Sequence, residues 1–308
     1  MLNVALTNQD PARLDLSLAA VLPYSRNQLQ KAIAAGAILV DNAASTPKSS
    51  VSIKNVVSYN PDYFTTAPIP AGTMPKLDII FENDDIIVVN KAAGVLSHPA
   101  PGSHEFTLAD ALKVHCPTME HVGDDAARAG LAHRLDRDAS GIVVAGKTRE
   151  AFLFLKKQFS ERLTTKHYTV LVLGNIVDDH GTITFPIARS ATLGRMAARP
   201  TSQEGKEAIT HYDVVERLNG HATLLDVVIE TGRTHQIRAH FFALEHPVVG
   251  DQLYVQKGQK QIDLGRLFLH ARELTIELPS GGQQTFTAPL PQALVDTLDH
   301  MRQSGRKH

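Results

Sequence analysis

Strand-like segments that follow one another with few helices between them are the feature that most constrains this fold. Short apolar runs of the buried-strand type occupy residues 85–90 and 141–145. Further strand patterns lie at residues 168–173, 182–186, 209–216, 223–230, 274–278 and 284–288. A doubly wound parallel sheet would need a helix after almost every strand. The pattern therefore predicts an α+β fold with a mixed, largely antiparallel sheet.

Two segments have helical rather than strand spacing. Residues 148–162 place Phe152 and Phe159 seven positions apart, on one face of a helix. Thr234 can cap a second helix, which we expect to run to about residue 245. The large apolar residues of this second helix are expected in the core.

The N-terminal segment, residues 10–60, predicts a separate small α/β domain. Leu14 begins an amphipathic pattern with a second leucine four residues later. Ser25 is a candidate N-cap of a second helix that ends at Gly36, and a short strand follows at residues 37–40. Two short helices before a small sheet are thus expected.

A stretch rich in proline and small residues, 61–75, predicts a linker between this domain and a larger one at residues 76–300. Arg26 and Lys31 lie on the second helix of the small domain. Together they would form a basic surface that a phosphate backbone could follow. We therefore expect the small domain to bind RNA.

The net charge of −1 is unevenly distributed along the chain. Residues 10–60 carry 5 basic and 3 acidic side chains, residues 133–238 carry 15 and 12, and residues 76–132 carry 4 and 9. This distribution permits RNA binding without demonstrating it. Charge alone leaves open a neutral enzyme that acts on a small molecule.

Composition also bears on redox chemistry and location. The single cysteine, Cys116, excludes an intramolecular disulfide and a cysteine-based zinc cluster. The start of the chain lacks the basic and apolar blocks of a secretory signal, and no apolar run approaches the roughly 18 residues of a membrane span. We expect a soluble, cytoplasmic protein that does not bind membranes.

Asp136 is the most conspicuous candidate for chemistry. It lies in a polar loop with arginines at positions 134 and 137, directly before a predicted strand. On these grounds alone Asp136 is either catalytic or, with Asp138, a residue that shapes the turn. His133 and His235 could suggest a metal site, but they lack the spacing of a known metal motif.

Three stretches together resemble the motifs of the RluA family of pseudouridine synthases: residues 132–141 (AHRLDRDASG), 166–170 (KHYTV) and 230–240 (ETGRTHQIRAH). The resemblance extends over residues 76–290. The N-terminal segment is similar to an RNA-binding module first recognised in a small-subunit ribosomal protein, which precedes many family members that act on large-subunit ribosomal RNA.

The resemblance implies a role for each residue of the site. Asp136 corresponds to the essential aspartate, Tyr168 to the tyrosine that packs against the target uracil, and Arg238 to the arginine that pairs with the aspartate. Arg134 corresponds to the residue that fills the gap left when the base swings out of its stack. The remaining implied contacts, to the substrate or the loop, come from His133, Arg233, His235 and Gln236.

The implied reaction breaks the bond from uracil nitrogen to ribose and rejoins the ribose to uracil carbon 5. No atoms are gained or lost, so no cofactor is required. An ionised carboxylate would attack the sugar or remove a proton from it, and which of these occurs is left open. A bidentate guanidinium would keep Asp136 charged and fix its direction. Alanines at positions 92 and 139 replace the proline and threonine that are usual in the family.

The implied partner is RNA, with ribosomal RNA favoured and transfer RNA left open; no protein partner is required. Two other functions compete with this hypothesis. A non-catalytic RNA-binding or ribosome-assembly factor could keep the fold, but it would be expected to lose Asp136 or Arg238. A glycoside or nucleoside hydrolase would need a second carboxylate across the bond, for which Asp138 is the nearby candidate.

Overall fold

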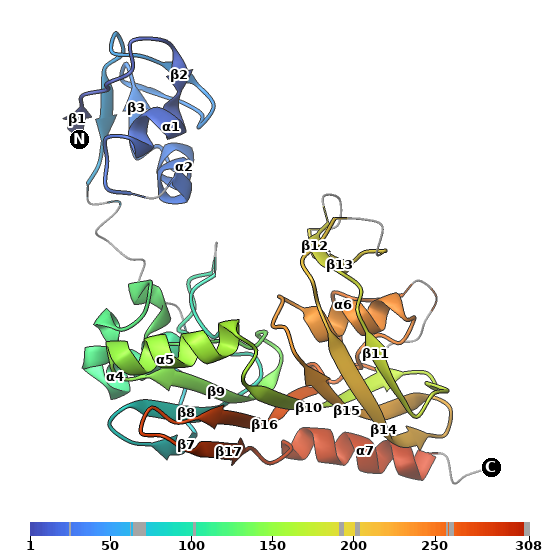
Figure 1. Cartoon of the computed structure of the whole chain (residues 1–308). Coiled ribbons are helices and arrows are strands. Elements are labelled where there is room, and N and C mark those ends of the chain that lie inside the picture. The colour runs from blue at the N-terminus through green and yellow to red at the C-terminus, as the bar shows by residue number, and fades with distance from the viewer. Residues whose placement is uncertain are drawn as a thin grey trace. The chain divides into compact units, whose positions relative to one another are not determined.

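The computed structural model describes residues 1–24, 26–61, 63, 72–100, 103–190, 194–200, 204–256, 258 and 262–304. The chain divides into two compact units, residues 1–69 and 70–308 (Figure 1). The predicted cap Ser25 and most of the predicted linker lie outside the described residues. The domain boundaries proposed above therefore stay a prediction.

The N-terminal unit is a small α/β structure. It contains strands β1 (Leu2–Val4), β2 (Ala12–Arg13), β3 (Ile38–Val40), β4 (Ala43–Ala44), β5 (Ser50–Val51) and β6 (Val57–Tyr59), and helices α1 (Leu14–Ala19) and α2 (Arg26–Ala34). The strands form an antiparallel sheet in the order β1-β6-β3-β4, and β2 pairs with β5. The leucines at 14, 18 and 29 are fully buried between the helices and the sheet.

A buried carboxylate joins the two helices of this unit. Asp15 has no exposed surface and accepts hydrogen bonds from Nε of Arg26 (2.8 Å), from Arg13 (3.1 Å) and from Gln30 (2.5 Å). Burial opposes the charge of this carboxyl, but these donors outweigh it and lower the pKa of Asp15 to about 2. Arg26 keeps 47% of its side chain exposed, so its predicted contact with RNA stays a prediction.

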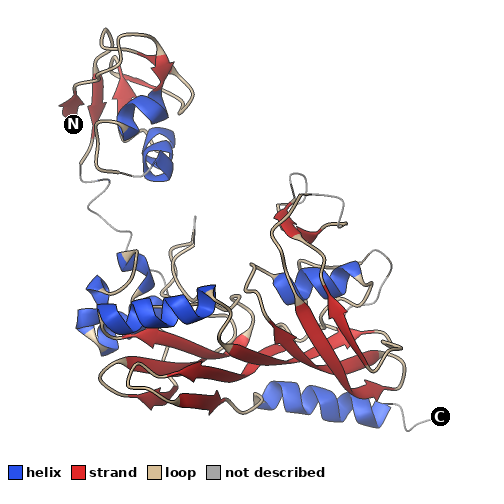
Figure 2. Ribbon diagram, viewed as in Figure 1, coloured by secondary structure: helices blue, strands red, loops and turns tan. Residues whose placement is uncertain are grey.

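The larger unit is built on one twisted sheet (Figure 2). Within the described residues its strands run in the order β11-β14-β15-β10-β16-β9-β8-β7, with β17 also paired to β16. The strands are β7 (Ile79–Glu82), β8 (Ile86–Lys91), β9 (Ser140–Gly146), β10 (Thr165–Leu173), β11 (His180–Ile183), β14 (Thr210–Leu218), β15 (Ala222–Ile229), β16 (Leu269–Glu277) and β17 (Gln283–Thr287). Among the strands of the described residues only β16 and β9 pair in parallel, so the predicted α+β fold with a largely antiparallel sheet is confirmed.

Helices cover both faces of this sheet. They are α4 (Leu108–His115), α5 (Arg149–Ser160), α6 (Gln236–Ala243) and α7 (Gln292–Ser304), with short 3₁₀ turns at Pro117–His121 and Ala126–Arg128. Val170 of β10 packs in the main core with residues of α4 and α6. The next residue, Leu171, packs with Leu294 and Leu298 of α7, because alternate side chains of a strand point to opposite faces. Figure 1 shows α6 and α7 on opposite sides of the strands.

The structure corrects two local predictions. Strand β11 ends at Ile183 instead of extending over residues 182–186. The N-cap of α6 is His235, not Thr234, and its backbone adopts the left-handed conformation with φ of 55°. The sequence also gave no prediction for α4, α7 or the hairpin of β12 (Ile187–Arg189) and β13 (Met196–Ala198). Among the described residues, no helix combines the length and the apolar character needed to cross a membrane.

Candidate active site

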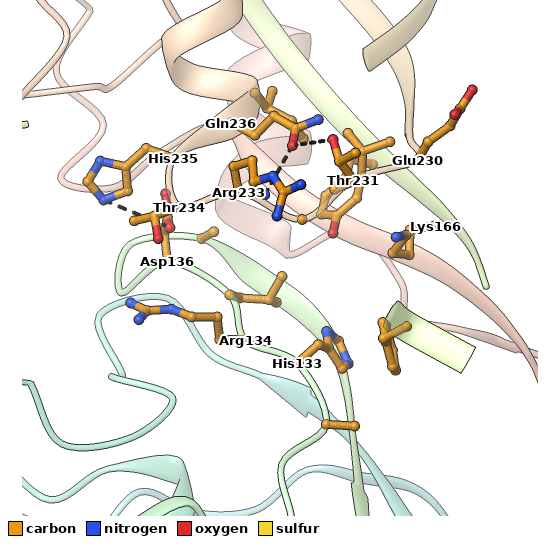
Figure 3. A pocket seen from close by; sticks show the side chains of 18 of the residues that line it. His133, Arg134, Asp136, Lys166, Glu230, Thr231, Arg233, Thr234, His235 and Gln236 are labelled. Atoms are coloured by element: carbon orange, nitrogen blue, oxygen red, sulfur yellow. Dashed lines mark hydrogen bonds and ion pairs between the residues drawn. The ribbon is translucent and has the colours of Figure 1, made fainter. Parts of the chain in front are cut away.

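The predicted site residues surround one cavity of about 560 Å³ in the larger unit (Figure 3). They come from three places: the loop before β9, the start of β10, and the turn from β15 into α6. All eight side chains singled out from the sequence line this cavity: His133, Arg134, Asp136, Tyr168, Arg233, His235, Gln236 and Arg238. Residues 100 positions apart in the chain thus share one site.

Asp136 and Arg238, which both line the cavity, form an ion pair. Nη1 of Arg238 donates to Oδ2 of Asp136 at 3.0 Å. Both side chains are largely buried, with 13% of Asp136 and 7% of Arg238 exposed. The contact predicted between them is therefore present, and the open cavity lies beside it.

The bidentate pairing predicted for Asp136 is instead made by a second carboxylate. Nε and Nη2 of Arg238 donate to Asp251 at 2.7 and 2.9 Å. Asp251 is fully buried and also accepts from the backbone N–H groups of Leu253 (2.8 Å) and Tyr254 (2.9 Å). Burial opposes the charges, but the pair outweighs it, raising the pKa of Arg238 and lowering that of Asp251. Arg238 is thus held as a fixed cation.

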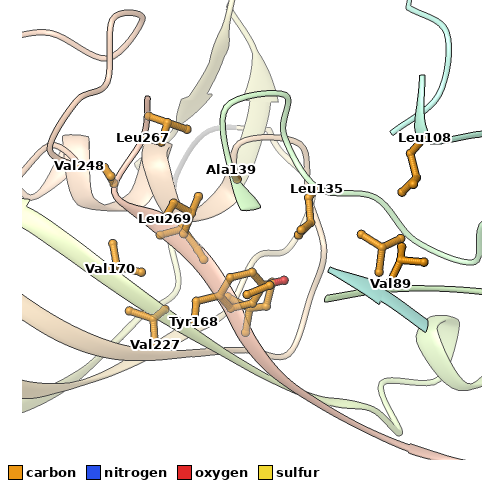
Figure 4. Packing of buried hydrophobic residues seen from close by; sticks show 14 of the residues in the cluster. Val89, Leu108, Leu135, Ala139, Tyr168, Val170, Val227, Val248, Leu267 and Leu269 are labelled. Carbon is orange, nitrogen blue, oxygen red and sulfur yellow. The ribbon is translucent and has the colours of Figure 1, made fainter. Parts of the chain in front are cut away.

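Tyr168 lines the cavity and packs among the buried apolar residues of the main core (Figure 4). It lies in β10, opposite Val227 of β15 and Ala271 of β16, and is 6% exposed. Burial, and then the charge of Asp136, raise the pKa of its phenol. The ring therefore stays neutral and offers an aromatic face next to the ion pair.

The loop that carries Asp136 is anchored by Lys91 at the end of β8. The Lys91 side chain is 2% exposed, and its Nζ donates to the carbonyls of Ala92 (2.9 Å), Val95 (2.8 Å) and Arg137 (3.1 Å). These bonds tie the segment after β8 to the residue that follows Asp136. Burial of its ammonium lowers the pKa of Lys91.

A second anchor of this loop is the hydroxyl of Ser97. It donates to the carbonyl of Leu135 at 2.9 Å and accepts from the N–H of the same residue at 3.2 Å. Gly94, with φ of 84°, donates its N–H to the carbonyl of Arg137 at 2.8 Å. The backbone on both sides of Asp136 is therefore fixed by hydrogen bonds.

His133 and Arg134 differ in what they can offer a substrate. The His133 ring stacks on Phe159 with a centroid distance of 4.4 Å, and its Nε2 accepts the N–H of Val144 at 3.1 Å. Burial, and then the charge of Lys166, lower the pKa of His133 to about 3, so it is neutral. Arg134 is exposed, and its guanidinium lies 3.3 Å from Nε2 of His98.

Both the oxygen and the nitrogen of the Gln236 side-chain amide form hydrogen bonds within the protein. Its Oε1 accepts from the hydroxyl of Thr231 (2.8 Å) and the N–H of Arg233 (3.0 Å). Its Nε2 donates to the carbonyl of Ile209 and the hydroxyl of Thr210, both at 3.0 Å. The side chain therefore shapes the turn into α6, and its predicted contact with substrate stays a prediction.

The described residues that line the cavity include one further carboxylate, that of Glu230, and do not include the predicted Asp138. Asp138 is exposed and does not line it. Glu230 lines it but binds Nε2 of His211 at 2.8 Å. Within the described part of the chain, no group of three or more candidate ligands gathers in a way that could hold a metal ion.

Sequence reasoning gave no role to Asp251, Lys91 or Ser97, although all three support the ion pair or its loop. Gly250-Asp251 and Asn90-Lys91 occur in segments that resemble the family, which was the available signal. Their function depends on contacts across the fold, which the sequence does not display.

Comparisons with known proteins agree with the geometry. The family model for RNA pseudouridylate synthase matches residues 85–243. A protein named ribosomal large subunit pseudouridine synthase D, from Nitrosomonas europaea, is 38% identical over 94% of this chain and 84% of its own length. An uncharacterized RNA pseudouridine synthase from Synechocystis is 35% identical over 94% of this chain and 89% of its own length.

Solved structures give a similar result. The human protein named RNA pseudouridylate synthase domain containing 1 superposes with a TM-score of 0.59 at 28% identity, covering 77% of this chain and 98% of that one. A second human protein, RNA pseudouridylate synthase domain containing 4, is 22% identical with a TM-score of 0.58 over 73% of this chain and 93% of its own, and shares the fold.

Proposed function

Because the chain belongs to the RNA pseudouridylate synthase family, we propose that it uses Asp136 to isomerise a uridine of large-subunit ribosomal RNA. The family activity makes the chain an isomerase that converts uridine in RNA to pseudouridine. The observation that carries the proposal is the buried ion pair of Asp136 and Arg238 beside an open cavity.

The ion pair supports a role for Asp136 on the sugar. Arg238 donates to Oδ2 of the carboxylate and leaves Oδ1, which lies 4.0 Å from Nε2 of His235, available for chemistry. An anion held beside a fixed cation in a poorly solvated site can attack the anomeric carbon or remove a sugar proton. Tyr168 supplies the surface on which the extracted uracil packs, and the exposed Arg134 exchanges its contact with His98 for the gap in the RNA stack.

Large-subunit ribosomal RNA is the substrate that the relatives favour. Those from Nitrosomonas europaea and Salmonella typhimurium are named ribosomal large subunit pseudouridine synthase D, and they are 38% and 36% identical to this chain. The small N-terminal unit would hold the RNA, with Lys31 as one basic contact. A ribosomal substrate would place the enzyme in the cytoplasm. Transfer RNA is the alternative substrate.

The test compares pseudouridine formation by the wild type with two matched variants, Asp136→Asn and Asp138→Asn. Large-subunit RNA from cells that lack the gene is the substrate, and products are mapped by carbodiimide labelling. We expect Asp136→Asn to form no product while keeping its fold and RNA affinity, and Asp138→Asn to resemble the wild type. Product from Asp136→Asn would refute the proposed mechanism, and a wild type that binds RNA without modifying it would favour the non-catalytic factor.

A further inference from the structure

A chain of polar contacts leads from the hairpin of β12 and β13 to the catalytic aspartate. The hydroxyl of Tyr254 donates to the carbonyl of Met196 in β13 at 2.8 Å. The same hydroxyl lies 3.2 Å from Nδ1 of His235. The other ring nitrogen of His235, Nε2, lies 4.0 Å from Oδ1 of Asp136, as the dashed line in Figure 3 marks.

These contacts fix the tautomer of His235. A tyrosine hydroxyl has one hydrogen, and the carbonyl of Met196 can only accept it. The Tyr254 oxygen must therefore accept from Nδ1–H of His235. Burial raises the pKa of Tyr254 to about 12, so it keeps its hydrogen. A neutral His235 then carries its lone pair on Nε2, on the side of Asp136.

The surroundings of His235 keep it neutral near pH 7. Burial is the largest cause that lowers its pKa, and the cations Arg238 and Arg134 lower it further. The carboxylates of Asp136 and Asp251 act in the opposite direction but do not outweigh burial. Two acceptors, Nε2 and Oδ1 of Asp136, thus face each other at 4.0 Å without a proton between them.

We propose that His235 accepts the proton that uracil carbon 5 releases in the last step of the isomerisation, with Tyr254 as the residue that positions it. The proposal rests on the proposed function and adds a proton acceptor to that site. After the carbon–carbon bond forms, carbon 5 still holds its original hydrogen, and a double bond joins carbon 6 to nitrogen 1. When that hydrogen leaves as a proton, its electron pair forms the carbon 5–carbon 6 double bond. The former double-bond pair moves to nitrogen 1, which takes a proton from water.

Geometry places His235 where this proton leaves. Carbon 5 is then bonded to the anomeric carbon of the sugar on which Asp136 acts, so an acceptor close to Asp136 is also close to carbon 5. The imidazolium formed would face the Asp136 carboxylate at 4.0 Å and would then return its proton to water. A nearby anion stabilises this transient cation.

Other residues that line the cavity are less suited to accept the proton. Nε2 of His133 already accepts a backbone N–H, and Tyr168 is a neutral phenol with a raised pKa. Glu230 is bound to a histidine at 2.8 Å. Asp136 is engaged with Arg238 through Oδ2 and acts on the sugar, whereas His235 presents an Nε2 lone pair on the side of Asp136.

The test is single-turnover kinetics of His235→Asn on RNA that carries uridine with either hydrogen or deuterium at carbon 5. Asparagine tolerates the left-handed backbone at this position and cannot accept the proton. We expect a rate lower by about 10²-fold or more and a primary isotope effect that the wild type lacks. The wild-type rate should also fall at a pH below 6.5, the ordinary pKa of histidine, and His235→Asn should lack this fall.

Two further variants separate proton transfer from structure. His235→Gly also suits the positive φ, and added imidazole should restore part of its rate. Tyr254→Phe keeps the aromatic ring but removes the hydroxyl that holds the hydrogen of His235 on Nδ1. This variant should therefore show a smaller isotope effect than His235→Asn. The exposed His180→Asn is the matched control and should behave as the wild type.

The outcomes distinguish this inference from the proposed function. The wild type could be active while His235→Asn shows no isotope effect and keeps the fall in rate below pH 6.5. That result would overturn the role of His235 and leave the proposed function standing. A His235→Gly variant that imidazole does not restore would count against it as well. If the wild type forms pseudouridine in transfer RNA and in no ribosomal RNA, the proposed substrate is wrong, and the same kinetics on that transfer RNA decide the role of His235.

Discussion

Replacing Asp251 with asparagine should destabilise the larger unit and disable the site together. The carboxylate of Asp251 accepts two bonds from the buried guanidinium of Arg238 and two from backbone N–H groups. An asparagine of the same shape has one acceptor oxygen, and its NH₂ group would face another donor. The variant therefore leaves a buried cation with only Asp136 as its partner.

The magnitude follows from these contacts. Removing one partner of a buried ion pair costs about 3–5 kcal/mol, and here Asp136 alone would compensate the Arg238 charge less well than the two carboxylates do together. For a folding unit of this size, the loss corresponds to a melting temperature lower by about 6–20 °C. Catalysis should fall by about 10²-fold in the protein that remains folded, since Arg238 would no longer hold Asp136 to within an ångström.

Thermal unfolding followed by circular dichroism measures the first effect, and single-turnover pseudouridine formation well below the melting temperature measures the second. Asp213→Asn, an exposed position on β14, is the control for loss of a carboxylate and should change neither. An Asp251→Asn variant that melts with the wild type would show that the pair does not stabilise the fold. Wild-type activity in that variant would show that Asp136 does not depend on it.

Two further substitutions test the support of the loop and the sheet. Lys91→Met removes the ammonium donor to three carbonyls, of which that of Arg137 keeps the N–H of Gly94, and should cost about 1–3 kcal/mol, measured as a lower urea midpoint; an unchanged midpoint would refute the anchoring role. Gly141→Ala would place Cβ at 2.2 Å from the carbonyl oxygen of Ala271 at a φ of 117° and should cost about 3 kcal/mol or more. A Cβ added by Gly232→Ala has no atom within 4 Å, so the stability of this variant should stay within about 0.5 kcal/mol of the wild type in the same unfolding assay. Equal losses of stability for the two glycine variants would contradict the predicted steric clash at Gly141.

The strand-rich pattern was sufficient to predict the fold class because short apolar runs report burial directly. It failed where local signals compete. Thr234 has the side chain of a typical N-cap, yet His235 takes that place, because the turn is fixed by the amide of Gln236 and requires a left-handed residue. Helix α4 has a capping box between Thr107 and Asp110, a signal that was present in the sequence and was overlooked.

The site could be predicted as a set of residues but not as a network. All eight predicted side chains line the cavity, since motif resemblance identifies residues that share a site. It does not reveal hydrogen-bond partners, and so the bidentate pair was assigned to Asp136 instead of Asp251. Likewise nothing in the sequence indicates that the Gln236 amide is fully used by the protein.

The division of Arg238 between two carboxylates has a chemical consequence. A bidentate arginine would occupy both oxygens of Asp136 and weaken it as a nucleophile or base. The structure gives the two strong parallel bonds to Asp251, a buried residue with no access to substrate, and leaves Asp136 with one bond at 3.0 Å. The guanidinium is thereby oriented by a partner that takes no part in the reaction. The Asp136 carboxylate is stabilised by the charge of Arg238 through Oδ2, and its Oδ1 atom stays free to act. The His235 ring lies on the side of Oδ1, with Nε2 at 4.0 Å.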